Sequence, residues 1–401
     1  MKNKLLITID GIRKDRLSCY NPKKQYLTPN FHRIAPECIL FEDMNASATS
    51  TGMCFASIFT GRYQKEFGRK TYGDTQNPFT DNLFKDFEDK GYKTIICLNK
   101  RFDVHARLIN AFSNAEFWWT GKTLEEAGQL KDASSLRPKE QAEYFIEKSD
   151  RVKAPYFAWI HLWGFSSPEK RFTDNITPFE YDARVAELDE AVGILFDHFK
   201  AESEMFIGAD HGYALFEKGR WSYGKDGHCL VEAVTSVPFL VYNGLQKGVN
   251  HELVSQTKLR EIVNNPKYAL DVKDSVSFCE TRYVDQPDIA LAVRRDKYKL
   301  IYYYDTGAYE FYDLMTDEQE TINYAGKRFH KLSRDDFGAH LALKPYILRT
   351  DWEVIEKAMT DMISKAKNYY GASFNPAKDR KWLKFARKIR GILKASYSRK
   401  R

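Results

Sequence analysis

Acidic and histidine side chains stand directly after apolar runs at two places in the chain. The stretch "EMFIGADHG" passes from apolar residues into Asp210 and His211, and "LLITID" ends in Asp10. Carboxylate oxygens gathered with an imidazole suit a divalent cation such as Mn²⁺, Mg²⁺ or Zn²⁺. Either run alone is as well explained by a solvated loop carboxylate, but two of them favour one bound metal ion.

A hydroxyl nucleophile is available in "ASATSTGMCFASIFTGRYQKEFG", residues 46–68. The small, hydroxyl-rich residues at its start are typical of a loop, "MCFASIF" of a short buried helix, and Gly61 of the end of that helix. Thr51 then falls at or just before the start of the helix, where a threonine usually serves as a cap. The alternative is that a metal lowers the pKa of the hydroxyl, so that Thr51 attacks an ester whose anion is held by free helix N–H groups.

These residues must be positioned by a sheet. The apolar runs "LLITID", "YFAWIH", "EMFIGAD" and "VPFLVY" read as strands, and helix-like stretches such as 181–200 lie between them. Such alternation predicts an α/β fold with a largely parallel central sheet and helices on both faces. Asp10 and Asp210 would then meet at the carboxyl edge of the sheet, where ligands bind in such folds.

We predict three parts along the chain. Residues 1–270 are expected to form the catalytic domain, 271–345 a small α+β subdomain of short antiparallel strands, and 346–401 a helical extension with a basic amphipathic tail. The 29% charged and 14% aromatic residues exclude a disordered protein. The six cysteines lack zinc-binding spacing and are expected to be free, mostly buried thiols.

The charge is concentrated at the carboxyl end. Residues 379–401 hold ten Lys or Arg and one Asp, a net of +9, so the chain's total of +7 leaves −2 for residues 1–378. Apolar and basic residues recur there at helical spacing, which favours peripheral contact with an anionic membrane; a helix docked on its own domain is the alternative. No nucleic-acid module is evident in the body, so we expect no nucleic-acid partner. Neither a membrane-spanning run nor a signal peptide is evident, so a cytoplasmic location is expected, with peripheral binding to the inner face of the membrane as an option.

Several blocks of the sequence resemble, in order, those of the alkaline phosphatase and sulfatase superfamily. They are "ITIDGIRKDRL", "TPNFHRIA", "TGMCFASIFTGRY", "GYKTIICLNK", "ADHG" and "EAVTSVPFLVY". The resemblance implies metal-assisted transfer of a phosphoryl or sulfuryl group through a covalent enzyme intermediate. By position it implies that Thr51 is the nucleophile and that the metal ligands are Asp10, Thr51, Asp210 and His211.

The same resemblance suggests three substrate contacts. His228 lies where family members place a Lys or His, although a loop histidine is an equal alternative. His161 could donate to a phosphate oxygen or be a hydrogen-bonded core residue. Lys100 follows "GYKTIICLN" with one residue more than the usual spacing in the family, and it is the third predicted contact.

Departures from the sulfatase pattern favour phosphorus chemistry. Thr51 stands where similar sulfatases carry the Cys or Ser that becomes formylglycine, and a threonine cannot form that aldehyde. Threonine is the nucleophile in the branches that this chain resembles more: nucleotide phosphodiesterases, phosphoethanolamine transferases and lipoteichoic-acid synthases. Gly11, Gly164 and Ser166 replace acidic and histidine residues of many relatives, so a single metal ion is expected.

The resemblance and the expected location together predict a phosphotransferase. It would move a phosphoglycerol- or phosphoethanolamine-type group from a phosphorylated small-molecule or lipid donor to a glycan or lipid-linked glycan. A phosphodiesterase or other hydrolase of the superfamily is the alternative. A catalytically inactive binding module is a further one, which the presence of Asp10, Thr51, Asp210 and His211 together disfavours.

Overall fold

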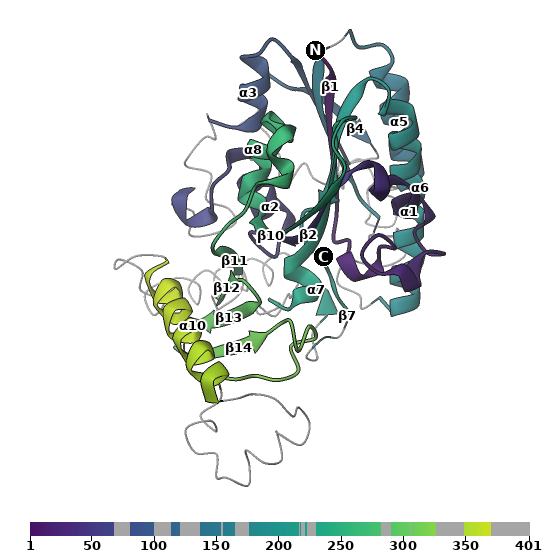
Figure 1. The fold of residues 1–401 in the computed structure, drawn as a ribbon. Helices are drawn as coiled ribbons and strands as arrows, with labels where there is room; N and C mark the ends of the chain where they lie inside the picture. Colours follow the sequence, from purple (N-terminus) through teal and green to yellow (C-terminus); the bar gives the residue numbers. More distant parts are fainter. Residues whose placement is uncertain are drawn as a thin grey trace, which may run out of the picture.

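The structure is a computed structural model whose ribbon is shown in Figure 1. It describes residues 1–67, 81–99, 114–120, 137–153, 155–164, 176–215, 217, 221–222, 230–281, 290–304, 306–325 and 349–369.

A sheet of eight strands, in the order β10-β2-β9-β6-β1-β5-β3-β4, forms the centre of the molecule. β9 pairs antiparallel with both β2 and β6, while the remaining pairings are parallel, so the largely parallel sheet expected from the sequence is confirmed. All strands except β9 therefore present their carboxyl ends at one edge. Their bounds are β1 Asn3–Ile9, β2 Ile39–Asn45, β3 Lys93–Asn99, β4 Glu116–Thr120, β5 Tyr156–Leu162, β6 Ser203–Ala209, β9 Ser236–Tyr242 and β10 Gly248–Ser255.

Helices cover both faces of this sheet, as the alternation of elements predicted. In Figure 1, α2, α3 and α8 lie on one face and α1, α5 and α6 on the other. Every residue of β1 and β5 is buried between these layers, which explains their apolar runs. The helices are α1 Pro29–Ile34, α2 Thr51–Thr60, α3 Leu83–Glu88, α5 Pro138–Ser149, α6 Pro178–Phe199, α7 Glu232–Thr235 and α8 Leu259–Asn264.

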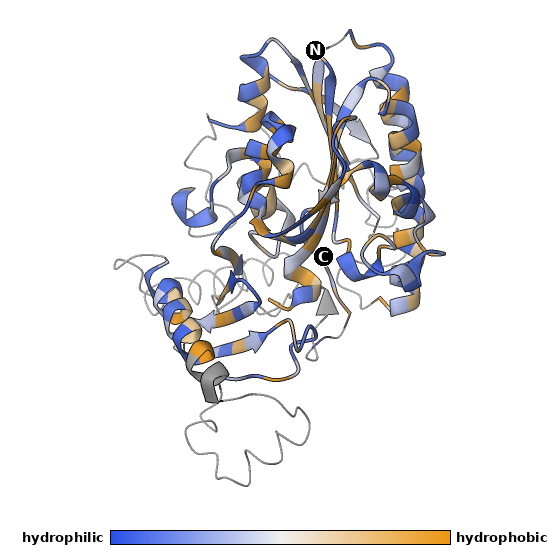
Figure 2. Cartoon of the chain, viewed as in Figure 1, coloured by the Kyte–Doolittle hydropathy of each residue, from blue (hydrophilic) through white to orange (hydrophobic). Residues whose placement is uncertain are grey.

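A second, four-stranded antiparallel sheet, β11-β12-β13-β14, lies beside the large one. Helix α10 (Arg349–Asn368) packs on it, and Figure 2 shows hydrophobic and hydrophilic residues alternating along that helix. The buried residues recur at helical spacing and share one core with the strands: Ile355, Met359, Met362 and Ala366. The strands are β11 Ser277–Thr281, β12 Ala290–Arg295, β13 Tyr298–Tyr303 and β14 Tyr309–Asp313, and a separate short pair is formed by β7 (Ala214–Leu215) and β8 (Trp221–Ser222). The domain boundaries at 270 and 345 stay predictions.

Buried ion pairs join the two sheets. Lys299 on β13 is fully buried and pairs with Glu232 on α7 and with Glu320, each at 2.8 Å. Arg294 on β12 pairs with the same Glu232, also at 2.8 Å, and with Asp43 on β2. Burial alone would raise the pKa of Glu232, but Arg294 and Lys299 outweigh it and hold that pKa far below its usual range. The carboxylate is therefore charged, and it fixes α7 to the small sheet.

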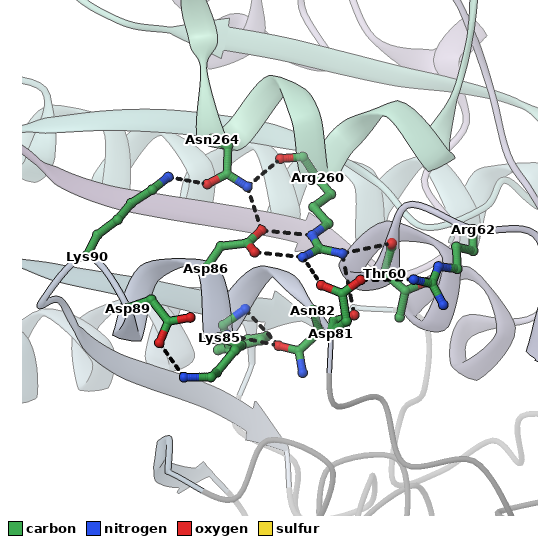
Figure 3. Close-up of polar contacts among 11 residues, drawn as sticks. Thr60, Arg62, Asp81, Asn82, Lys85, Asp86, Asp89, Lys90, Arg260 and Asn264 are labelled. Atoms are coloured by element: carbon green, nitrogen blue, oxygen red, sulfur yellow. Dashed lines mark hydrogen bonds and ion pairs between the residues drawn. The ribbon is translucent and has the colours of Figure 1, made fainter.

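A second polar network, drawn in Figure 3, holds the carboxyl end of α2. The guanidinium of Arg260 on α8 forms a two-pronged pair with Asp86 on α3, at 2.8 and 2.6 Å. It also donates to Asp81 and, at 3.2 Å, to the carbonyl of Thr60, the last residue of α2. Because α2 begins at Thr51, this network fixes the far end of the helix that carries the expected nucleophile.

Two further expectations concern cysteines and membranes. Cys38, Cys54, Cys97 and Cys279 are buried free thiols and Cys19 is free and partly buried, as predicted for these five, while Cys229 lies outside the described residues. Among the described residues, no helix is both long and apolar enough to cross a bilayer. The basic tail, residues 379–401, lies outside the described part of the chain.

Candidate active site

The carboxyl edge of the central sheet brings four of the expected residues together. Asp10 follows β1, and Asp210 and His211 follow the neighbouring strand β6. The hydroxyl of Thr51 donates to Asp10 Oδ1 at 3.3 Å and lies 3.2 Å from His211 Nε2. His211 Nε2 is 3.9 Å from Asp10 Oδ1 and 3.6 Å from Asp210 Oδ2. The expected nucleophile and metal ligands thus form one cluster.

Backbone N–H groups orient the Asp210 carboxylate. Its Oδ1 accepts from the N–H of Gly11 at 3.2 Å and from that of His211 at 2.8 Å. Its Oδ2 is buried and has no hydrogen-bond partner in the described part of the chain. A buried carboxylate oxygen without a donor is costly, and a bound cation would remove that cost.

The ring of His211 is held in one tautomer. Its Nδ1 lies 2.8 Å from the carbonyl oxygen of Gly212, and a carbonyl only accepts, so Nδ1 carries the proton when the ring is neutral. The lone pair of Nε2 then faces Thr51 and the two carboxylates. This is the form of histidine that binds a metal.

Thr51 is the first residue of α2, as the sequence predicted, but it is not the cap. Ser50 holds the N-cap position, and no side chain makes a cap hydrogen bond there. The Thr51 hydroxyl instead faces the acidic cluster, and Thr51 is partly exposed whereas Asp10, Asp210 and His211 are buried. The Thr51 hydroxyl therefore lies against buried carboxylates, beside the positive end of a helix.

The donor set fits a divalent cation. Asp10, His161 and Asp210 each offer one atom, and these atoms lie within 4.8 Å of one another, all from buried side chains. Burial, and next the negative charge of Asp210, raise the pKa of Asp10, as expected for two carboxylates crowded in a region of low dielectric. A cation would lower that pKa and let both carboxylates stay ionised.

His161 joins this cluster more closely than the sequence suggested. It was expected to contact substrate, and it lies within β5, next to β1, where it pairs in register with Thr8. Its Nδ1 lies 2.8 Å from Thr8 Oγ1, which also accepts from the indole N–H of Trp159 at 2.8 Å. His161 is placed to bind either the metal or an ester oxygen. The sequence could not reveal this, because it does not show that β5 lies beside β1.

The loop after Asp10 is braced by residues that the sequence did not single out. The buried hydroxyl of Tyr181, on α6, donates to the Gly11 carbonyl and accepts from the Arg13 N–H, both at 2.8 Å. Arg13 also forms a two-pronged pair with Asp15, at 2.8 Å, and this pair braces the same loop. No sequence signal connects residue 181 with residue 11.

Other site predictions have different outcomes. Lys100, His228 and Ser166 lie outside the described residues, so the first two stay predicted substrate contacts. Gly11 has a left-handed φ of +60°. A Cβ at Gly164 would lie 2.8 Å from Leu188 of α6, so the buried packing here opposes a side chain where relatives often place an acid.

Comparisons with known proteins identify the family of this chain. The chain matches the Sulfatase family model over residues 2–261. It is 27% identical over 172 residues to an N-acetylglucosamine-6-O-sulfatase of Bacteroides thetaiotaomicron, a match that covers 40% of this chain but only 30% of that protein.

Among solved structures, the fold is similar to that of a 2-O GAG sulfatase, with a TM-score of 0.62, 14% identity and coverage of 92% of this chain and 93% of the other. It is equally similar to a phosphonate monoester hydrolase of Agrobacterium radiobacter, with a TM-score of 0.62, 16% identity and coverage of 85% and 95%. At these identities the likeness concerns the fold. The family model, which spans well over half of the chain, carries the assignment: the chain belongs to the sulfatase family.

Proposed function

We propose that this chain is a metal-dependent enzyme that cleaves phosphoric esters through a covalent intermediate on Thr51. The observation that carries the proposal is the position of the Thr51 hydroxyl, 3.3 Å from Asp10 and 3.2 Å from His211, beside a buried acidic cluster. Membership of the sulfatase family supports ester cleavage in general. The threonine itself favours phosphorus over sulfur, because it cannot be converted to formylglycine.

Each residue of the cluster has a role in this reaction. Asp10, Asp210 and His211 would hold a divalent cation, with His161 as a further ligand or as a donor to the ester. When bound, the cation supplies positive charge next to the Thr51 oxygen and the ester oxygens. Asp10 accepts the hydrogen bond of the Thr51 hydroxyl and holds its oxygen in place, and the hydroxyl proton passes to solvent.

The covalent steps then balance as two displacements at phosphorus. The Thr51 oxygen forms a bond to phosphorus while the bond to the leaving ester oxygen breaks, and the leaving oxygen takes a proton from solvent and departs as an alcohol. The positive end of the α2 dipole favours the anionic group at this point. A hydroxyl acceptor next attacks phosphorus while the bond to Thr51 breaks, and the proton that the acceptor loses restores the Thr51 hydroxyl.

The acceptor decides between transfer and hydrolysis. We propose transfer of a phosphoglycerol- or phosphoethanolamine-type group from a phosphorylated small-molecule or lipid donor to a glycan or lipid-linked glycan. The resemblance to threonine-nucleophile transferases supports it. Water as acceptor would make the enzyme a phosphodiesterase of the same superfamily.

Sulfate ester hydrolysis is the second candidate. The family name and the relative from Bacteroides thetaiotaomicron both favour it. It ranks second because the nucleophile position holds Thr51.

Esters that share one leaving group distinguish these functions. The protein is freed of metal, reloaded with Mn²⁺, Mg²⁺ or Zn²⁺, and given p-nitrophenyl phosphodiester, phosphonate and sulfate substrates. We expect the phosphorus esters to have a kcat/KM about tenfold or more above that of the sulfate, a difference of about 1.4 kcal/mol in the barrier. Faster turnover of the sulfate would contradict the proposed cleavage of phosphoric esters and favour sulfate ester hydrolysis.

Transfer is tested by adding glycerol as an alternative acceptor. Phosphorus NMR of the products should show a glycerol ester at the expense of the hydrolysis product. Hydrolysis alone at all glycerol concentrations would favour the phosphodiesterase.

A further inference from the structure

The two halves of the candidate site belong to segments that are not neighbours in the sheet. Thr51 follows the loop after β2, whereas Asp210 and His211 follow β6, and β9 lies between these two strands. Asp10 belongs with the second half, because β1 pairs directly with β6. The separation between the Thr51 hydroxyl and the metal ligands therefore depends on contacts that cross β9.

The side chain of Gln256 makes such a contact. It follows β10 at the edge of the sheet, and it is fully buried. Its Nε2 donates to the carbonyls of Ala209 and Asp210, at 2.9 and 2.6 Å. Its Oε1 accepts from the N–H of Ser47 at 3.2 Å, in the loop that leads to Thr51. One amide thus connects the two halves directly.

The three partners require an amide at this position. Two carbonyls need two N–H donors, and the Ser47 N–H needs an acceptor, and only a primary amide offers both on one side chain. A carboxylate would set a negative oxygen against two carbonyls. An apolar side chain of the same length would leave all three groups buried without their partner.

We propose that Gln256 is a positioning residue that sets the distance between Thr51 and the Asp10–Asp210–His211 group. The expected effect of Gln256 on turnover rests on the proposed function, whereas its effect on the distance does not. Asp10 and Asp210 stay together through β1 and β6 when the amide is lost, whereas Thr51 moves relative to them. A shift of about 1 Å at a reacting group can lower the rate about a hundredfold. Loss of the Gln256 amide should therefore slow the chemical step.

Asn250 provides a matched control. It lies on β10, is as buried as Gln256, and makes the same set of bonds: its Nδ2 donates to the carbonyls of Ala269 and Val272, at 2.8 and 2.9 Å, and its Oδ1 accepts from the Glu252 N–H. None of these partners belongs to the candidate site. Asn250→Leu and Gln256→Met should therefore cost similar stability, and only the second should affect the reaction.

The experiment measures Mn²⁺ affinity by calorimetry and turnover of a p-nitrophenyl phosphodiester for the wild type and both variants. For Gln256→Met we expect Mn²⁺ affinity within about threefold of the wild type and kcat lowered about tenfold or more, with KM little changed. For Asn250→Leu we expect both quantities to be unchanged. A Gln256→Met variant with wild-type kcat, or one whose Mn²⁺ affinity falls in parallel with kcat, would overturn the proposal.

A second measurement separates this proposal from the proposed function. In crystal structures of the two proteins, the distance between Thr51 Oγ1 and His211 Nε2 should be longer in Gln256→Met than in the wild type. An unchanged distance would refute the positioning role even if no substrate is turned over, while a longer one would support it. If Gln256→Met does not fold, Gln256→Asn takes its place, because its shorter amide cannot reach both Ser47 and the carbonyls of Ala209 and Asp210. We expect it to lower kcat and to leave Mn²⁺ affinity little changed.

Discussion

Two carboxylates and an imidazole are buried around the hydroxyl of the partly exposed Thr51 at the candidate site. Asp10 and Asp210 repel each other there, and one oxygen of Asp210 has no hydrogen-bond partner among the described residues. Such crowding is unfavourable in a protein without metal, because burial penalises both charges. The same arrangement favours a divalent cation, which explains why the site has these residues.

Replacing one carboxylate should therefore affect metal binding more than folding. In Asp210→Asn the amide oxygen can still accept from the Gly11 and His211 N–H groups, while one of the repelling charges is gone. We expect Mn²⁺ affinity to fall about tenfold or more, with no loss of stability in the presence of a chelator. Calorimetry measures the Mn²⁺ affinity, and urea unfolding measures the stability.

Asp189 is the control for this variant. It is also a buried carboxylate, and it accepts from the N–H groups of Asn30 and Phe31 at the start of α1, away from the site. Asp189→Asn should leave Mn²⁺ affinity unchanged. Full metal occupancy in Asp210→Asn would contradict the assignment of the ligand.

Gly212 shows a different constraint on a single residue. Only glycine fits at this position, because a Cβ would lie 2.0 Å from the Ala233 carbonyl oxygen of α7. Gly212→Ala should shift the adjoining His211 and lower kcat about tenfold or more. Gly91→Ala, strained by a left-handed φ of +81° but with open space around it, should lose stability and keep its activity. Equal activity of the two variants would show that the His211 loop tolerates the shift.

At the scale of elements, the ends of helices and strands fix the site. α2 is held at its carboxyl end by Arg260, and α7 supports the loop after β6 through hydrogen bonds from the N–H groups of Gly212 and Tyr213. α7 is in turn fixed to the small sheet by Glu232. Loss of either anchor should weaken the fold around the site.

The Arg260 anchor can be tested by stability. Arg260→Met removes the two-pronged pair with Asp86 and the bonds to Asp81 and Thr60, and we expect it to lower the free energy of unfolding by about 1–2 kcal/mol. The control is Arg33→Met, which removes an exposed two-pronged pair with Asp197 and should cost less than about 0.5 kcal/mol. Urea unfolding compares them, and equal losses would mean that the network adds nothing beyond a surface pair.

The Glu232 anchor predicts a pH dependence. Because the pKa of Glu232 in the folded protein lies below its usual value of 4.5, its contribution to stability is present above pH 4.5 and is lost as the pH falls below that value. Glu232→Gln should therefore be about 3 kcal/mol less stable than the wild type at pH 7, since it leaves Lys299 and Arg294 short of a partner. The difference should shrink in urea unfolding at lower pH. A difference independent of pH would show that Glu232 is not charged in the folded protein.

For the whole molecule, the sequence was most informative where a strand ends in a polar residue. Asp10, Asp210 and His211 follow apolar runs, and parallel strands bring such ends to one edge, so their meeting could be predicted. Thr51 could be placed because Gly61 marks the other end of its helix, where φ is +72°. These predictions depend on local patterns within single segments.

Contacts between distant segments could not be predicted in this way. The place of His161 depends on β5 pairing with β1, and that of Gln256 on a side chain that crosses β9. The packing of α10 on the small sheet likewise depends on a surface that no local pattern reveals. These contacts depend on the order of the strands in the sheet or on how two surfaces pack together. Neither can be read from the sequence of a single segment.

The central claim is that Thr51 attacks the ester. Intact-mass analysis after rapid acid quench during turnover of a p-nitrophenyl phosphodiester tests it most directly, with Thr51→Ala as the variant. The cap position belongs to Ser50, so this variant should remain folded. We predict a phosphate-bearing adduct on Thr51 in the wild type, and neither adduct nor turnover in the variant. Turnover by Thr51→Ala near the wild-type rate, or an adduct on another residue, would contradict the account.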